Sequence, residues 1–159
     1  MDKFSNIINE GQSSKFKLGI DVHGVIDSMP DFFAFMSKSF ISGGGEVHII
    51  TGTSWTKEVE DELESYGIKY THHFSIYDHL IGLGIKTSGE IQFPDGTIQR
   101  KFKDEDWDGI KAEYCLKNNI TLHIDDTLAY NEYFTTPFAR IWTHNNHPKS
   151  PHRDIRHMY

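Results

Sequence analysis

One acid, Asp21, interrupts an otherwise apolar stretch at residues 18–26, and it is the first candidate for chemistry in this chain. The apolar run is typical of a strand buried on both faces of a sheet, and Gly24 marks a turn or a close approach of the backbone. A carboxylate beside such a strand is costly to bury unless something compensates its charge. Because open α/β sheets bind ligands beyond the carboxyl ends of their strands, Asp21 is either a ligand-site residue or a simple loop cap.

Two later apolar runs end in polar side chains in the same way. Thr51 follows the letters V-H-I-I, and Asp125 and Asp126 follow T-L-H-I. If the three runs are neighbouring strands of one parallel sheet, their polar ends lie side by side at one edge of that sheet. The pattern therefore favours a site built from three strand ends over three unrelated loop caps.

Strands and helices alternate along most of the chain, which predicts an α/β fold with a mostly parallel central sheet and helices on both faces. The strands are expected at residues 18–26, 46–51, 70–74, 120–125 and 138–143, and the helices at 31–40, 55–66, 75–83, 104–118 and 127–134. Residues 90–102 alternate apolar and polar side chains around a turn at 94–96, which indicates a β-hairpin.

Capping signals and apolar stripes add detail to the expected helices. Ser28 is expected to cap the first helix, with Pro30 in its first turn, and Thr53 or Ser54 to cap the second. The first helix carries a wide apolar face that we expect to pack on the sheet: Phe32, Phe33, Phe35, Met36 and Phe40. The helix at 104–118 has a second such face: Trp107, Ile110, Tyr114 and Leu116.

The composition limits the class of protein. A chain of 159 residues forms one domain, and its net charge of -7 argues against broad binding to nucleic acids or anionic membranes. Cys115 is the only cysteine, so no internal disulfide can form. The single cysteine fits a reducing, cytoplasmic setting best. The sequence has no apolar run that could span a bilayer, and its N-terminus lacks the apolar core of a signal peptide. The pairs His72–His73 and His144/His147 come without a cysteine pair, which favours surface histidines over zinc ligands.

The ordered strand ends resemble the motifs of the haloacid dehalogenase-like (HAD) superfamily of aspartate-nucleophile phosphohydrolases. The first motif of that family, D-x-D-G-[TV], is similar to D-V-H-G-V at residues 21–25, where His23 replaces the second acid. Thr51 stands at the second motif, Lys111 at the third, and the acidic pair 125–126 at the fourth. The four motifs occur in the order that the family has.

The resemblance covers residues 16–143 and implies a Rossmann-like HAD fold in which this segment is the catalytic domain. A polar leader at 1–15 and a basic tail at 144–159 are expected to flank it. The insertion between the second and third motifs, at about residues 70–102, is small and contains the hairpin. Such a minimal cap implies an open site, which admits a bulky substrate or a small one covered by a partner subunit.

By this resemblance, Asp21 is the nucleophile that attacks phosphorus and forms an aspartyl-phosphate, which water then hydrolyses. Thr51 and the N–H group of Gly52 would bind the transferring phosphoryl group, and Lys111 would offset negative charge. Two other lysines are alternatives for the third motif: Lys101 and Lys103. His23 stands where the family has the residue that protonates the leaving oxygen and then takes a proton from water, and imidazole can do both.

The carboxylates of this site would repel a phosphate unless a cation lay between them. Mg²⁺ prefers carboxylate and carbonyl oxygens together with water. The resemblance implies a Mg²⁺ ion bound by Asp21, the backbone carbonyl of His23 and Asp125. Asp126 is an alternative ligand or a support for the other ligands.

The function expected from these features is Mg²⁺-dependent hydrolysis of a small phosphorylated substrate, with nucleotides and nucleic-acid ends among the candidates. A second class is a catalytically degenerate, regulatory protein that binds phosphoryl groups, which the replacement of an acid by His23 favours. A third class is a dehalogenase, which uses the same nucleophile without a metal. The retained acidic pair at 125–126 argues against this third class.

Overall fold

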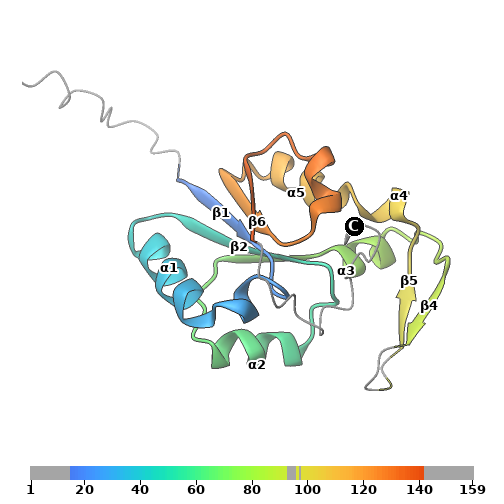
Figure 1. Ribbon diagram of the computed structural model, residues 1–159, viewed down its shortest axis with the longest axis horizontal. Coiled ribbons are helices and arrows are strands. Elements are labelled where there is room, and N and C mark those ends of the chain that lie inside the picture. Colours follow the sequence, from blue (N-terminus) through green and yellow to red (C-terminus); the bar gives the residue numbers. More distant parts are fainter. Residues whose placement is uncertain (1–14, 93–95, 97, 142–159) are drawn as a thin grey trace, which may run out of the picture.

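The chain folds around a parallel sheet of five strands in the order β3-β2-β1-β6-β7, shown in Figure 1. The computed structural model describes residues 15–92, 96 and 98–141. The strands of this sheet are β1 (Lys17–Ile20), β2 (Glu46–Thr51), β3 (His72–Ser75), β6 (Leu122–Asp125) and β7 (Phe138–Arg140). An antiparallel hairpin joins β4 (Gly89–Gln92) to β5 (Ile98–Lys101). The predicted parallel sheet and the predicted hairpin are therefore confirmed.

Helices flank the sheet, and their placement follows from the order of its strands. The helix α1 (Pro30–Ser42) connects β1 to β2, and α2 (Lys57–Ser65) connects β2 to β3, so both cover one face (Figure 1). The chain then passes through α3 (Ile76–Gly82), the hairpin, α4 (Asp104–Trp107) and α5 (Ile110–Lys117) before it enters β6. Because crossovers between parallel strands are right-handed, this reversal of direction carries α5 to the opposite face. The segments after β1 and β6 therefore diverge and open a crevice.

The core fills both faces of the central strands. Ile49 and Ile50 are adjacent in β2 and both fully buried, but they pack in different clusters. Ile49 packs in the cluster that contains Phe33 of α1, whereas Ile50 packs with Cys115 of α5. Successive residues of a strand point to opposite faces, and helices cover both faces here. This explains why β2 is buried from Val47 to Thr51 without alternation.

The first strand is shorter than predicted. β1 ends at Ile20, so Asp21 lies just beyond it, and a turn leads into the 3₁₀-helix η1 (Ile26–Ser28). Gly24 has a φ of 88° in this turn, and its N–H group donates to Asp27 Oδ1 at 2.7 Å. Val25 of the turn is fully buried although it is not in a strand. The residues of the apolar run at 18–26 are apolar because they are buried. The prediction wrongly assigned all of them to a strand, although only the first part of the run is one.

The capping prediction for the first helix is wrong in part. Met29 occupies the N-cap position of α1, while the Ser28 hydroxyl donates to the Val25 carbonyl oxygen at 2.6 Å within η1. Pro30 stands in the first turn of α1, as predicted. A 3₁₀ turn immediately before α1 engages the Ser28 hydroxyl locally, so it cannot serve as the cap.

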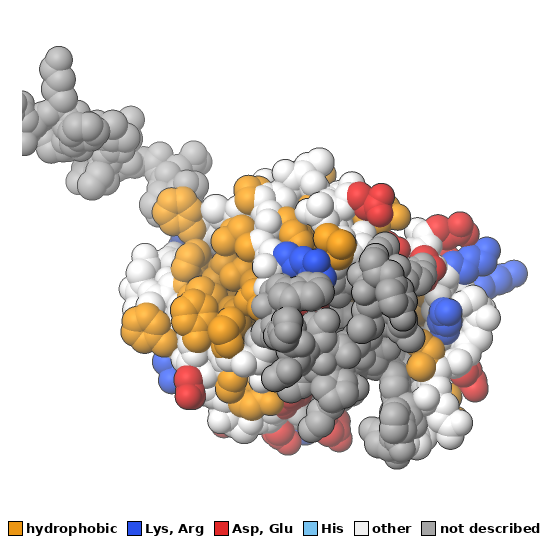
Figure 2. Space-filling model, in the orientation of Figure 1, with side chains coloured by type: hydrophobic (Ala, Val, Ile, Leu, Met, Phe, Trp, Pro, Cys, Tyr) orange, Lys and Arg blue, Asp and Glu red, His pale blue; other side chains and the backbone are white. Residues whose placement is uncertain are grey.

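The apolar stripe of α1 is narrower than predicted. Phe33 is fully buried, but Phe32 is 53% exposed and Phe35 is 72% exposed. Only one side of a helix faces the sheet; the buried residues of α1 are Phe33, Ala34 and Ser37, and the predicted Met36 and Phe40 are partly buried against the same core. Apolar side chains gather on the surface over α1 in Figure 2.

The helix predicted at 104–118 is two helices, α4 and α5. Trp107 is buried, as predicted, and its indole N–H donates to the Tyr130 hydroxyl at 2.8 Å. Leu116, predicted to face the core, is 63% exposed. The buried positions of α5 are Lys111, Ala112 and Cys115. The break between α4 and α5 changes the direction that each side chain faces, which a single helical period did not anticipate.

The remaining differences concern the ends of segments. β3 is the edge strand of the main sheet, so the insertion predicted at 70–102 includes part of the sheet itself. The helix predicted at 127–134 is the 3₁₀-helix η2 (Leu128–Tyr133), and β7 ends at Arg140. The predicted tail, and the predicted leader apart from Lys15, lie outside the described residues. Within the described ranges, no helix combines the length and apolar character that crossing a membrane requires.

Candidate active site

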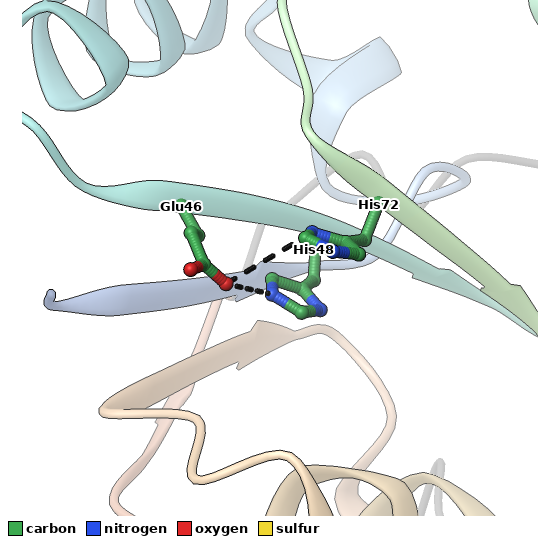
Figure 3. A group of neighbouring side chains, drawn as sticks. All are labelled: Glu46, His48 and His72. Carbon is green, nitrogen blue, oxygen red and sulfur yellow. Dashed lines mark hydrogen bonds and ion pairs between the residues drawn. The ribbon is translucent and has the colours of Figure 1, made fainter.

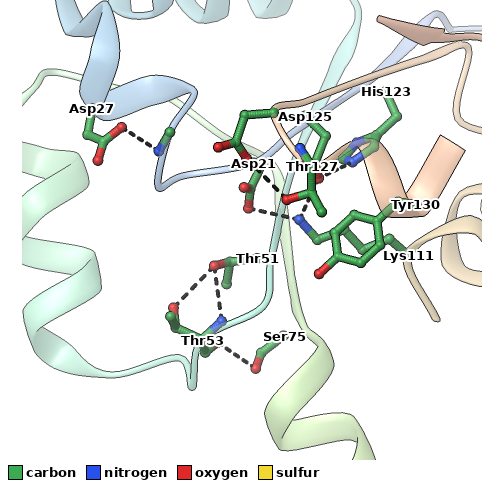
Figure 4. A network of polar contacts seen from close by, with 12 residues as sticks. Asp21, Asp27, Thr51, Thr53, Ser75, Lys111, His123, Asp125, Thr127 and Tyr130 are labelled. Carbon is green, nitrogen blue, oxygen red and sulfur yellow. Dashed lines mark hydrogen bonds and ion pairs between the residues drawn. The ribbon is translucent and has the colours of Figure 1, made fainter. Parts of the chain in front are cut away.

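The polar strand ends meet at the carboxyl edge of the sheet, as Figure 4 shows. Asp21 follows β1, Thr51 is the last residue of β2, and Asp125 is the last residue of β6. β1 lies between β2 and β6 and pairs with both in parallel. The Asp21 N–H group donates to the Ile124 carbonyl oxygen at 3.0 Å, which extends this pairing to the site. The sheet thus brings together side chains that are far apart in the sequence.

Lys111 joins the two acids at the centre of the site. Its Nζ lies 2.9 Å from Asp21 Oδ1 and 2.6 Å from Asp125 Oδ2. The lysine is 1% exposed, and α5 leads directly from it into β6. Burial alone would lower the pKa of Lys111, but Asp125 and Asp21 raise it above its ordinary value, so the ammonium group stays charged.

The two alternative lysines lie elsewhere. Lys101 is in β5 and Lys103 follows it, and both line a groove at the base of the hairpin together with Ser88. Lys103 pairs with Glu105 at 3.4 Å. Lys111 is therefore the lysine that the fold brings to Asp21.

Asp125 is held by donors on both of its oxygens. His123 Nε2 lies 3.1 Å from Oδ2, the oxygen that also accepts from Lys111, and the Thr127 N–H group donates to Oδ1 at 2.9 Å. Burial alone would raise the pKa of Asp125, but Lys111 and His123 outweigh it and hold this pKa well below its usual range. Asp125 therefore stays ionised and orients the Lys111 ammonium group.

His123 was not predicted to belong to the site. Its imidazole is fully buried and stacks on Phe134 with the ring centroids 5.2 Å apart. Gly19 of β1 makes room for the ring, because a Cβ atom at Gly19 would lie 2.8 Å from His123 Nδ1. The sequence signal was present: a histidine two residues before an acid on one strand shares its face of the sheet.

Asp21 has a different electrostatic environment. Burial raises the pKa of Asp21 to about 7; Lys111 opposes this shift, and the carboxylates of Asp125 and Asp126 add to it. One lysine thus faces three carboxylates and cannot compensate all of their negative charge. Asp21 is the carboxyl group that is least stabilised in its ionised form. A group with two positive charges at this place would favour the ionised form of Asp21.

Asp126 packs against the turn that follows β1. A Cβ atom at Gly24 would lie 2.2 Å from Asp126 Oδ2, so only glycine fits beside this carboxylate. The Thr127 hydroxyl donates to Asp126 Oδ1 at 3.3 Å. Burial and the neighbouring Asp125 raise the pKa of Asp126 above its usual value. Asp21, Asp125 and Asp126 each place an oxygen within 4.8 Å of the others.

The loop after β2 forms the second wall of the site. The hydroxyl oxygens of Thr51 and Thr53 lie 3.1 Å apart, and the Thr53 N–H group donates to Thr51 Oγ1 at 3.3 Å. Ser75 in turn donates to the Thr53 carbonyl oxygen at 2.7 Å. The prediction that Thr53 caps α2 is wrong, because Thr56 occupies that N-cap position. Thr53 instead holds the Thr51 side chain in place.

Ser54 does not cap α2 either. Its hydroxyl donates to Asp78 Oδ1 at 2.6 Å, and the Trp55 N–H group donates to Asp78 Oδ2 at 2.7 Å. Asp78 belongs to α3, whose N-cap is Ser75. These bonds tie the loop after β2 to α3 and fix the position of the Gly52 backbone next to Asp21.

His23 is paired with a residue that the sequence did not point to. Its Nε2 lies 3.5 Å from Glu62 Oε2 of α2, and Tyr66 donates to the other Glu62 oxygen at 3.1 Å. Burial alone would lower the pKa of His23, but Glu62 and Asp21 outweigh it and raise that pKa above its usual value. Glu62 of α2 therefore points toward the site and holds His23.

A cleft with about 260 Å³ of empty space, part of it open to solvent, lies over these residues. Its lining is Asp21, His23, Thr51, Gly52, Thr53, Lys111, Thr127 and Tyr130. The part of this space that the centre of a water molecule can occupy is about 10 Å³, which is room for about one water molecule. With the side chains in this arrangement, a ligand would therefore lie mostly outside the cleft.

Tyr130 and Thr127 are further lining residues that the sequence did not predict. The Lys111 ammonium group lies 5.1 Å from the centre of the Tyr130 ring, a cation–π arrangement. Thr127 is the N-cap residue of η2 and Tyr130 lies within it. The periodicity of the sequence did not indicate that this 3₁₀-helix lies beside the cleft.

Comparison of this chain with protein-family models, with curated proteins and with solved structures gives no match.

Proposed function

We propose that this protein is a HAD-like phosphomonoester hydrolase that requires Mg²⁺ and forms an aspartyl-phosphate on Asp21. The observation that carries the proposal is the buried bridge of Lys111 between Asp21 and Asp125, at the strand ends beside Thr51. Buried ion pairs often contribute little net stability compared with apolar residues of the same size, and an ion pair with only a structural role would not have to line a cleft. The bridge, the cleft and the neighbouring hydroxyl and N–H groups together match what phosphoryl transfer requires.

The donors at this site fit a magnesium ion. Three carboxylates converge on one another, and the single positive charge of Lys111 leaves them with excess negative charge. Burial raises the pKa of both Asp21 and Asp126, and the neighbouring carboxylates add to each shift. Oxygen donors of this kind suit Mg²⁺.

The contacts favour Asp126 over Asp125 as a ligand. Asp125 already accepts from Lys111, His123 and the Thr127 N–H group. The Asp126 carboxylate accepts the longer bond of the Thr127 hydroxyl. We therefore assign the ion to Asp21, the backbone carbonyl of His23 and Asp126, with Asp125 orienting Lys111. When bound, the ion would neutralise charge on the phosphate and on Asp21.

In the first half-reaction, an Asp21 oxygen attacks phosphorus and the bond to the leaving oxygen breaks. The His23 imidazolium gives that oxygen its proton. In the second half-reaction, neutral His23 takes a proton from water, whose oxygen attacks phosphorus and releases phosphate and free Asp21. Glu62 stabilises the imidazolium form, which His23 has before the first half-reaction and regains in the second.

Three groups hold the phosphoryl oxygens during both steps. The Thr51 hydroxyl and the Gly52 N–H group face the cleft from a loop that Asp78 and Ser75 keep rigid. Lys111 supplies positive charge next to the attacking carboxylate. Donors that are already in place when charge develops are worth more than donors that must reorganise.

Phosphate release from a panel of phosphomonoesters tests the proposal. Nucleoside monophosphates, sugar phosphates and phosphorylated oligonucleotides represent the substrate classes. We expect release that depends on Mg²⁺ and stops when the ion is chelated. Tight binding of phosphate without turnover would favour the regulatory alternative, and halide release from a haloacid without Mg²⁺ would favour the dehalogenase.

We expect millimolar Mg²⁺ to raise the melting temperature of the wild-type protein. A ligand of the native state at about 100 times its Kd contributes about 2.7 kcal/mol of stability. Asp126→Asn removes a proposed ligand and should abolish the shift, whereas Asp31→Asn, at an exposed position in α1, should keep it. Thermal denaturation with and without Mg²⁺ measures both variants. An undiminished shift in Asp126→Asn would show that the ion is bound elsewhere.

We expect His23→Ala to slow alkyl phosphates much more than p-nitrophenyl phosphate. An alkyl alcohol needs a proton as it departs, whereas p-nitrophenolate is a good leaving group without one. General acid catalysis contributes on the order of a hundredfold, so the loss on alkyl substrates should have this size. His73→Ala, at an exposed position of β3, is the matched control. Equal slowing of both substrates would remove His23 from the proton transfer.

A further inference from the structure

Three side chains with metal-ligand chemistry meet at the other end of β2, as Figure 3 shows. Glu46 is the first residue of β2 and Thr51 is the last, so this cluster lies about 16 Å from the candidate active site along the strand. Glu46 and His48 are two residues apart and share a face of the sheet. His72 is the direct neighbour of His48 on β3 and shares the same face.

The ligand atoms of these residues converge. Glu46 Oε2 lies 3.2 Å from His48 Nε2 and 4.0 Å from His72 Nδ1. One donor atom from each residue lies within 4.8 Å of the other two. Two ligand atoms that each lie about 2.1 Å from a tetrahedral ion are about 3.4 Å apart. The cluster is therefore close to the size that one ion requires.

His48 is already oriented as a ligand. Its side chain is 2% exposed, and its Nδ1 lies 2.9 Å from the Tyr114 hydroxyl of α5. Histidines that bind metals are usually held in this way through their second ring nitrogen. This contact leaves Nε2 directed at Glu46.

We propose that Glu46, His48 and His72 form a Zn²⁺ site. Two imidazole nitrogens and one carboxylate oxygen are a donor set that zinc prefers, and three protein ligands leave a fourth position for water. The site is independent of the proposed hydrolase activity, since it shares no residue with the cleft. An ion here would join β3, the edge strand of the sheet, to β2.

Two groups move when zinc binds. The His48 and His72 rings are stacked with centroids 4.3 Å apart and planes 13° apart, so both lone pairs cannot point at one ion in this arrangement. His72 is exposed, so its ring can give up the contact of Nδ1 with Thr71 Oγ1, which is 2.9 Å long, and turn toward the ion while His48 stays in place. The Lys17 ammonium group, 3.4 Å from Glu46 Oε2, turns away into solvent.

Zinc titration of three full-length proteins tests this site. We compare the wild type, His72→Ala and His73→Ala, whose replaced side chain stacks on Trp55 instead. The active-site acids and the tail histidines are the same in all three. We expect His73→Ala to bind Zn²⁺ like the wild type, and His72→Ala to bind at least tenfold more weakly at one equivalent. Competition with a chromophoric chelator measures the affinity, and the visible bands of tetrahedral Co²⁺ report the geometry.

Glu46→Gln provides the second variant, because it keeps the size of the side chain and weakens the oxygen donor. We expect it to lose the Zn²⁺ equivalent as His72→Ala does, and both variants to lose the rise in melting temperature that Zn²⁺ gives the wild type. Wild-type affinity in either variant, or an equal loss in His73→Ala, would overturn the proposal.

Discussion

Asp21→Asn should reduce turnover at least about 10⁴-fold while leaving the fold intact. An amide is nearly the same size as a carboxylate but is a poor nucleophile, so the aspartyl-phosphate cannot form. The fold should tolerate the change. Asp21 is one of three neighbouring acids, and its ionised form is poorly stabilised at this site, so a neutral amide should cost little stability. Phosphate release measures turnover, and circular dichroism with urea denaturation measures the fold.

The control for this experiment is Asp31→Asn, which removes an exposed acid of α1 and should leave turnover unchanged. Rapid acid quenching after mixing with labelled substrate adds a direct readout. Covalent phosphate should be recovered on the wild type and be absent from Asp21→Asn. If the variant turned over at a rate near that of the wild type, Asp21 would not be the nucleophile.

Lys111→Met should destabilise the protein by about 3–5 kcal/mol in the absence of divalent ions. The lysine is 1% exposed and is the ion-pair partner of both Asp21 and Asp125, so its removal leaves two buried carboxylates uncompensated. Methionine fills a similar volume, which separates the loss of charge from the loss of packing. Urea denaturation in the presence of a chelator gives the free energy of unfolding.

Lys101→Met, at an exposed position of β5, is the matched control for Lys111→Met and should change stability by less than about 0.5 kcal/mol. The double variant Lys111→Met with Asp125→Asn should be more stable than Lys111→Met alone, because it removes one of the two buried carboxylates that have lost their ion-pair partner. A loss below about 0.5 kcal/mol in Lys111→Met would mean that the bridge contributes nothing to stability.

The sequence predicted the sheet and the strand-end residues correctly because both depend on local patterns. Apolar runs that end in Thr51 and Asp125 identify buried strands whatever the rest of the chain does. Parallel strands then align their carboxyl ends without further information. The same reasoning exaggerated the first strand, because Val22 and Val25 are apolar in order to be buried in a turn.

Residues that reach the site from other layers were beyond the sequence patterns. Glu62 looks like any acid of an exposed helix, and its contact with His23 depends on how α2 packs under the turn after β1. His123 and Tyr130 likewise depend on the packing of β6 and η2 around Lys111. A periodic pattern states which residues share a face, but not what lies opposite that face.

The sequence by itself determined the order of the polar groups along the chain: an acid near the end of the first strand, a hydroxyl at the end of the second, and an acidic pair at the end of the strand that the structure shows as β6. Tertiary structure alone decided which lysine completes the site and which histidines and acids pair. Lys111 rather than Lys101 reaches Asp21 because α5 packs on the main sheet, where its Cys115 lies in one cluster with Ile50 of β2, whereas β5 lies in a separate hairpin. The physical reason is that strand periodicity is encoded locally, while each pairing is set by the packing of helices onto the sheet.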